Sequence, residues 1–305
     1  MGRYIVQRIV QTIIVLFVVC TVVFLLLRAV GDPARLLVNP EGSKEGIEII
    51  RKSLGLDLPL WKQYVNYIKG IVTLDFGTSF TYKKPVVDLI KVHLPSTLQL
   101  TFFSLLIAVV SGVTLGCISA IKQYSIFDNI ATFLAVFTRA VPGFWLGIML
   151  ILIFSVRLNW LPPSGYGSFK KLIMPSVSLA LSMAPVIARL TRSSMLEIIK
   201  SDYIRTARAK GQTERTIIMK HALRNTLIPV VTMVGLQMGH LLGGSIVIET
   251  VFAWPGIGRL LIESINVYDF PVIQTTVFMI AVFFVLINFF IDMLYLLIDP
   301  RIRLG

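Results

Sequence analysis

The sequence predicts an all-α membrane protein with six transmembrane helices and with both termini in the cytoplasm. Composition is the first observation: the 305 residues are 55% hydrophobic and only 15% charged, whereas soluble domains are about 25% charged. The second is that charge-poor runs alternate with polar segments, and about 20 apolar residues span a bilayer as a helix. The third is that Lys and Arg gather between these runs, which keeps such segments on the cytoplasmic side.

The first span lies in the N-terminal segment, residues 1–30. Residues 9–27 carry no charge, and this run is longer than the apolar core of a cleaved signal peptide. Arg3 and Arg8 precede it, so the N-terminus is predicted inside. Gly31-Asp32-Pro33 ends the helix, because glycine and proline both break helices.

A polar insert, residues 31–94, is expected outside the membrane. We predict a short helix over residues 43–54 that ends at Gly55. Apolar residues at helical spacing then predict an amphipathic helix, namely Leu60, Tyr64, Ile68 and Ile71. Asp75-Phe76-Gly77 begins a turn. Two roles stay open for the insert: a cap on the outer mouth of the membrane domain, or a brace packed against it.

Residues 95–305 are predicted to form the core transmembrane domain. Its five spans are expected at residues 97–121, 131–156, 172–188, 225–251 and 272–298. Arg139 interrupts the third span, where an ionisable side chain must face protein or water. It either lines a pathway through the bundle or pairs within it. Pro142-Gly143 predicts a bend just after it.

Glycines in the predicted fifth span indicate close helix packing. Gly235, Gly239 and Gly243 give the GxxxG spacing twice, and small residues let helix backbones approach closely in membranes. The partner of this face is either a second subunit or another helix of the same chain. At the outer end of this span, Glu249 is either a polar group facing a pathway or a solvated interfacial carboxylate.

The most polar long segment between two apolar runs is a cytoplasmic loop, residues 189–224. It holds nine Lys and Arg against three acids. Asp202 is predicted to cap a first helix, and Gly211 to end it, since glycine reverses a chain without a Cβ penalty. Thr213 to Leu223 reads as a second helical run. Helix, glycine turn and helix predict a rigid knob suited to a socket on another protein.

The knob also carries a family resemblance. The loop contains Arg205-Thr206-Ala207, then Gly211 four residues later, and Ile228-Pro229 follows it. This pattern resembles the EAA loop of membrane permeases of ATP-binding-cassette importers, in the variant of oligopeptide, dipeptide, nickel and glutathione permeases. The strict Glu-Ala-Ala is absent, because Arg205 stands where the family has Glu. The runs LGLDLPLWKQYVNYIKG, GGSIVIETVFAWPGIGRLL and DMLYLLIDPRIR are also similar to this family. The resemblance covers essentially the whole chain.

The resemblance implies a type I importer permease fold in a bacterial or archaeal cytoplasmic membrane. It implies four kinds of partner: a second homologous permease, two ATPase subunits, an external solute-binding protein and the lipid bilayer. The ATPase-coupling residues would be Asp202, Tyr203, Arg205, Thr206, Ala207, Arg208, Ala209, Lys210, Gly211 and Pro229. Glu249 and Arg139 are candidates for the translocation path. The expected solutes are dipeptides or short peptides, with glutathione or a nickel or metal chelate as the alternative.

Several other functions are disfavoured by the residues themselves. The net charge of +13 comes from basic loops without aromatic interleaving, so positive-inside topology explains it better than nucleic-acid binding. Cys20 and Cys117 lie in apolar runs, and no Cys/His spacing predicts a metal site. No GxxxxGK[ST] phosphate loop is present, so ATP and Mg²⁺ are expected on partner subunits and no cofactor or enzymatic activity is expected of this chain.

Two classes of alternative stay open. A stand-alone secondary transporter or channel would show several intramembrane charges, repeated halves or broken helices at the midplane. Apart from Glu249 at the outer end of the fifth span, the spans contain only two charged residues, Arg139 and Asp292. A membrane scaffold or sensor would carry a soluble signalling domain, and none is recognised in the sequence.

Overall fold

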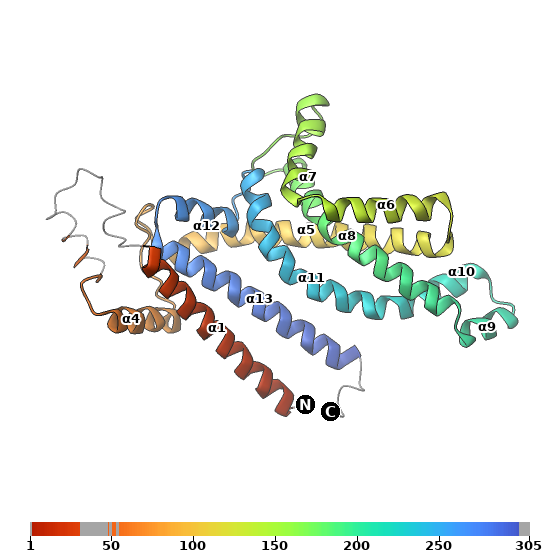
Figure 1. The fold of residues 1–305 in the computed structure, drawn as a ribbon, viewed down its shortest axis with the longest axis horizontal. Helices are drawn as coiled ribbons and strands as arrows, with labels where there is room; N and C mark the ends of the chain where they lie inside the picture. The colour runs from red at the N-terminus through yellow and green to blue at the C-terminus, as the bar shows by residue number, and fades with distance from the viewer. Residues whose placement is uncertain (1, 31–47, 49–50, 53–54, 299–305) are drawn as a thin grey trace. The chain divides into compact units, whose positions relative to one another are not determined.

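The computed structural model describes the chain apart from residues 1, 31–47, 49–50, 53–54 and 299–305. The described residues are mainly helical (Figure 1), with one isolated β-bridge between Thr78 and Pro85. They form two compact units, one of Met1–Thr97 with Pro255–Leu286 and one of Leu98–Trp254 with Ile287–Gly305. Most of the helix predicted over residues 43–54 and the C-terminal arginines lie outside the described residues.

Among the described residues, the first unit contains three complete helices and the beginnings of two others. The complete helices are α1 (Gly2–Val30), α4 (Leu60–Thr73) and α12 (Ile257–Asn266); the others are α5 (Val86–Ile121) and α13 (Phe270–Ile298). The amphipathic helix predicted after residue 59 is confirmed as α4. Its Tyr64 and Tyr67 rings lie 5.3 and 5.7 Å from the Phe24 ring of α1, so aromatic contacts hold α4 against the apolar helix.

The loop between α4 and α5 is held in place by Asp269. This carboxylate is fully buried and accepts hydrogen bonds from the Ser79 hydroxyl at 2.5 Å and from the backbone N–H groups of Phe80 and Thr81 at 3.2 and 3.0 Å. The predicted turn at Asp75 is confirmed, because its carboxylate accepts from the Gly77 N–H. Sequence reasoning did not predict α12, which is short and apolar on one side only.

The second unit contains the remaining helices. They are α6 (Ile126–Ala140), α7 (Gly143–Leu150), η1 (Ile151–Arg157), α8 (Phe169–Ile199), α9 (Asp202–Ala209), α10 (Glu214–Thr216), η2 (Ile217–Ala222) and α11 (Leu223–Val251), together with the ends of α5 and α13. Helix α8 contacts α6, α7 and α11 and supplies half of the buried residues of the core cluster, including Met174, Met183 and Ile187. It is therefore the central helix of this unit.

Two glycines of α5 allow the closest helix contact in this core. A Cβ atom added at Gly112 would lie 2.8 Å from the Ile187 side chain, and one at Gly116 would lie 2.5 Å from the Ala188 carbonyl oxygen. Larger residues at these positions would separate α5 from α8. In α11, a Cβ atom at Gly235 would lie 2.8 Å from Ile291 of α13, which supports the intrachain alternative for that glycine.

Four described helices are long and apolar enough to cross a membrane, and six spans result if each of two bent helix pairs counts as one. The bend predicted at Pro142-Gly143 is confirmed, but at 108° it is so sharp that the predicted third span is two helices rather than one. Figure 1 shows α7 turning away from α6. The second pair meets at 61° between Gly239 and Gly243 in α11, a break that sequence reasoning missed.

Candidate functional site

The knob is formed by α9, α10 and η2, where α8 ends and α11 begins (Figure 1). Ile204 and Ala207 of α9 are buried in a small apolar cluster. The other members of this cluster are Ala120, Met195, Ile217 and Ala222. Because α9 packs against the rest of this chain through Ile204 and Ala207, its opposite face is exposed and available to a partner protein.

The turn of the knob is held by a glycine and by an ion pair. Gly211 adopts a φ of 76°, a left-handed conformation that glycine adopts without strain, and its N–H donates to the Arg208 carbonyl oxygen at 2.9 Å. The predicted helix end at Gly211 is thus confirmed. Across the turn, Arg208 donates to both carboxylate oxygens of Glu214 at 2.7 and 3.3 Å. This carboxylate raises the pKa of Arg208.

The predicted cap by Asp202 is wrong. Ser201 occupies the N-cap position of α9 and its side chain makes no capping hydrogen bond, while Asp202 is the first helical residue. The Asp202 carboxylate lies 3.5 Å from Arg205 instead. The carboxylate still lies near the positive end of the helix dipole. The second predicted helix begins after Thr213, whose hydroxyl accepts from the Thr216 N–H.

Most of the predicted coupling residues share the exposed side of the knob. The exposed members are Asp202, Tyr203, Arg205, Thr206, Arg208, Ala209, Lys210 and Gly211. Ala207 is buried, and Pro229 is half-buried inside α11. The Tyr203 hydroxyl accepts a hydrogen bond from the Asn225 amide at 2.9 Å, which links the exposed face of α9 to α11. Sequence reasoning missed this link, since no spacing pattern pairs the two residues.

A buried ion pair ties α6 to α8. Asp128 is 3% exposed, and Arg192 donates to its two carboxylate oxygens at 2.7 Å each. The Tyr124 N–H donates to the same carboxylate at 2.9 Å, and the Ser119 hydroxyl donates to it as well. Bidentate Arg–carboxylate pairs fix geometry as well as charge. Sequence reasoning missed this pair, because 64 residues separate its members.

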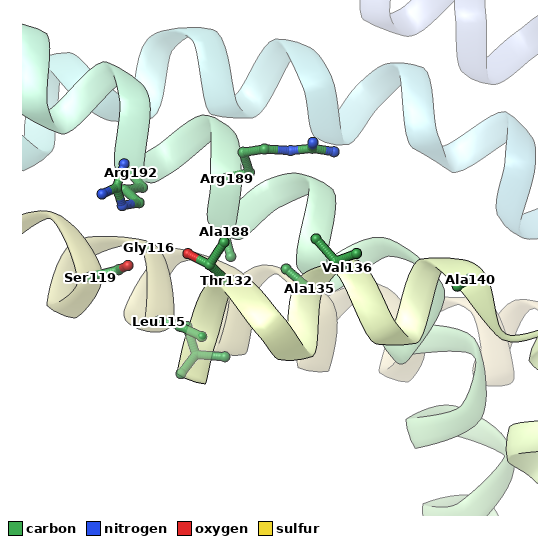
Figure 2. Close-up of a pocket in the computed structure, with 11 residues that line it drawn as sticks. Leu115, Gly116, Ser119, Thr132, Ala135, Val136, Ala140, Ala188, Arg189 and Arg192 are labelled. Carbon is green, nitrogen blue, oxygen red and sulfur yellow. The ribbon is translucent and has the colours of Figure 1, made fainter. Parts of the chain in front are cut away.

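Two pockets open on this unit. The larger, of about 700 Å³, lies between α5, α6 and α8. Figure 2 shows Arg189 and Arg192 reaching it from α8, and Ala135, Val136 and Ala140 forming its α6 wall. The smaller, of about 450 Å³, lies between α7, α8 and α11 and is lined by uncharged residues that include Ser178, Ser182 and Gln237. We call it the α7–α8–α11 pocket.

The two predicted pathway residues have different outcomes. Glu249 is fully buried in α11 and interacts with another residue of the chain, which disfavours the solvated alternative. Its role in the pathway stays a prediction. The Arg139 side chain lies outside the part of the chain that the structure describes. Among the described residues, no group of three His, Cys, Asp or Glu side chains is arranged to hold a metal ion.

Comparisons with known proteins identify the family. Residues 112–304 match the model of the binding-protein-dependent transport system inner membrane component, and residues 1–101 match its N-terminal component. The chain belongs to this family. It is 45% identical over 304 residues to the glutathione transport system permease proteins GsiC of Escherichia coli strain K12 and Shigella dysenteriae serotype 1, covering 99% of each chain.

Solved structures show the same fold. An inward-facing structure of the MetNI methionine ABC transporter matches with a TM-score of 0.59 at 24% identity, covering 70% of this chain and 97% of that one. A structure of an amino acid ABC transporter with histidines matches with a TM-score of 0.51 at 18% identity, covering 70% and 94%. The family match and the fold agree, and the chain is therefore a multi-pass permease of an ABC importer.

Proposed function

We propose that this permease forms half of a translocation pathway for short peptides, glutathione included, and that separate ATPase subunits drive it through the knob. A second homologous permease would supply the other half, and an external solute-binding protein would deliver the solute. ATP and Mg²⁺ would bind only to the ATPases. The shape of the knob is the single observation that carries this proposal.

The knob is suited to transmit force because it is fixed internally and exposed externally. Ile204 and Ala207 anchor α9 in the apolar cluster, and the Tyr203–Asn225 hydrogen bond joins α9 to α11. A push on the exposed face would therefore move α8 and α11 together. Movement of these helices would shift the unit between inward-open and outward-open arrangements, a two-state equilibrium biased by ATP and by the docked binding protein.

The test uses a bulky substitution that the chain itself can accommodate. Lys210 is exposed at the end of α9, so Lys210→Trp should leave the knob folded while blocking a socket. Loss of a central interface contact costs enough to lower recovery of the ATPase subunits by about tenfold or more. Recovery is measured by copurification from detergent, together with binding-protein-stimulated ATP hydrolysis.

The matched control is Lys122→Trp, at an exposed lysine in the loop between α5 and α6. We expect wild-type recovery for this variant. Ala207→Glu is a poorer probe, because it buries a charge inside the knob and would unfold it. Normal ATPase recovery with Lys210→Trp, or equal losses for the two lysine variants, would contradict the coupling role.

The solute class rests on the relatives and on chemistry that both candidate solutes share. The relatives named above are glutathione permeases, and glutathione and dipeptides both contain peptide bonds. Equilibrium binding of reduced glutathione and of dialanine to the cognate solute-binding protein measures the solute class directly. Binding of a nickel chelate in place of both would overturn the peptide assignment.

A further inference from the structure

The α7–α8–α11 pocket places uncharged polar groups within the membrane domain. Gln237 stands at the midpoint of α11, and Ser182 lies on an exposed part of α8. Both line the pocket, beside apolar residues such as Phe144, Leu241 and Val247. Concave, mostly apolar sites with a few polar groups are typical of small-molecule binding.

We expect the Gln237 side chain to face protein or water rather than lipid, because an amide without a hydrogen-bond partner is costly in hydrocarbon. No partner for this amide is found among the residues that the structure describes. Polar side chains at such depth face the bundle interior or a water-filled cavity. Gln237 therefore marks the α7–α8–α11 pocket as part of an aqueous path.

The backbone next to Gln237 supports the same conclusion. Helix α11 breaks by 61° between Gly239 and Gly243, and Gly243 and Gly244 are exposed. Broken helices near the membrane midplane are found where transporters bind solute, because irregular backbone is tolerated only beside protein or a water-filled cavity. Gly244 also lines the pocket, so the break and the polar groups belong to one site.

The polar groups offer a hydrogen-bonding pattern that fits an amide. The Ser182 hydroxyl donates its proton to the Leu179 carbonyl oxygen at 2.6 Å, so its oxygen remains an acceptor. The Gln237 side chain carries both donors and an acceptor. A peptide bond presents one N–H donor and one carbonyl acceptor, and the charge-free lining selects such a group over a charged terminus.

We propose that the α7–α8–α11 pocket is a solute-contact site in which Gln237 donates to the carbonyl oxygen of a peptide bond while Ser182 accepts from its N–H. This site rests on the proposed import function and deepens it by naming the group that is recognised. It makes Ser182 the residue that distinguishes an amide from an ester, and Gln237 the residue that holds the carbonyl group.

The test compares an amide solute with its ester analogue in wild-type and variant forms of the complete transporter, reconstituted in liposomes with its ATPases and binding protein. The probe pairs are glutathione with its analogue that has glycolate in place of glycine, and dialanine with alanyl-lactate. Uptake of each probe and ATP hydrolysis are measured. All forms use the same binding protein, so its own preference cancels when a variant is compared with the wild type.

In the wild type we expect the amide probe to be transported more efficiently than the ester probe. Ser182→Ala removes the acceptor for the peptide N–H, which the ester lacks, so it should lower the amide-to-ester ratio by about fivefold, the value of one net hydrogen bond. Gln237→Met keeps the side-chain length and removes the donor to the carbonyl oxygen, which both probes carry, so it should lower uptake of both probes and leave their ratio as in the wild type. Recovery of the assembled complex should be unchanged in both variants. The matched control for Gln237→Met is Gln99→Met on the exposed side of α5, which should keep wild-type uptake, ratio and ATP hydrolysis.

Three outcomes would overturn the site: a wild-type amide-to-ester ratio in Ser182→Ala, equal uptake of the probes by Gln237→Met and Gln99→Met, or a parallel loss of assembly that marks Ser182 or Gln237 as a packing residue. Failure of the proposed function looks different. In that case the wild-type complex itself imports neither glutathione nor dialanine, whatever residue stands at position 237.

Discussion

The joint between α6 and α8 and the turn of the knob each contain an Arg–carboxylate pair, but in opposite surroundings. Asp128 is 4% exposed at its side chain and its partner Arg192 is 28% exposed, whereas Arg208 and Glu214 are 40% and 60% exposed. The four donors around Asp128 come from three segments of the chain, while the Arg208 pair spans a single turn. The buried pair is therefore expected to fix the fold, and the exposed pair to shape a surface.

The largest effect is expected from Asp128→Asn, which leaves the Arg192 charge without its counterion. Breaking a buried pair from one side costs about 3 kcal/mol or more. The free energy of unfolding, measured by SDS titration of the purified permease in mixed micelles, should fall by that amount. Because α8 leads into the knob, ATPase recovery should fall with it.

The double variant Asp128→Asn with Arg192→Gln sharpens this prediction. Removing both charges leaves no unpaired ion, and such replacements are often close to neutral. We expect the double variant to regain most of the stability lost by Asp128→Asn. A double variant that is less stable than the single one would show that the hydrogen bonds, rather than the charges, hold this joint.

An intermediate effect is expected from Gly211→Ala. A Cβ atom there meets no atom within 4 Å, so only the left-handed backbone resists the change, at about 1–2 kcal/mol. Gly211→Asn should cost less, since asparagine tolerates this conformation better. ATPase recovery and unfolding of both variants measure the difference, and equal behaviour would exclude backbone strain as the cause.

The smallest effect is expected from Arg208→Gln. Exposed ion pairs contribute little to stability, so unfolding in SDS should be indistinguishable from that of the wild type. A change in ATPase recovery without a change in stability would show that Arg208 contacts the ATPase directly. A clear loss of stability would erase the contrast between the two pairs.

Local patterns allowed the sequence to predict much of this architecture. Charge-poor runs located α1 and α8, helical spacing located α4, and Gly211 marked the turn of the knob. Each of these signals lies within a few residues of the feature that it predicts. The coupling residues came from the family resemblance, and their contact with an ATPase stays a prediction.

What the sequence did not reveal depends on contacts between distant segments. The Asp128–Arg192 pair, the Tyr203–Asn225 hydrogen bond and the break in α11 follow from how helices pack, and no periodicity encodes them. The Asp202 cap failed for a local reason, since α9 begins one residue earlier than the capping pattern requires. Gln237 went unnoticed because an uncharged amide stands out only once its pocket is known.

The Asp269 anchor has a consequence for how the chain is made. Its hydrogen bond to Ser79 joins residues 190 positions apart, so the ribosome must complete most of the polypeptide before the loop between α4 and α5 finds its acceptor. Until then, the N–H groups of Phe80 and Thr81 have no carboxylate to bind. A chain truncated before Asp269 would thus lack the acceptor that holds this loop, and we expect the loop to be more open to proteolysis than in the complete chain.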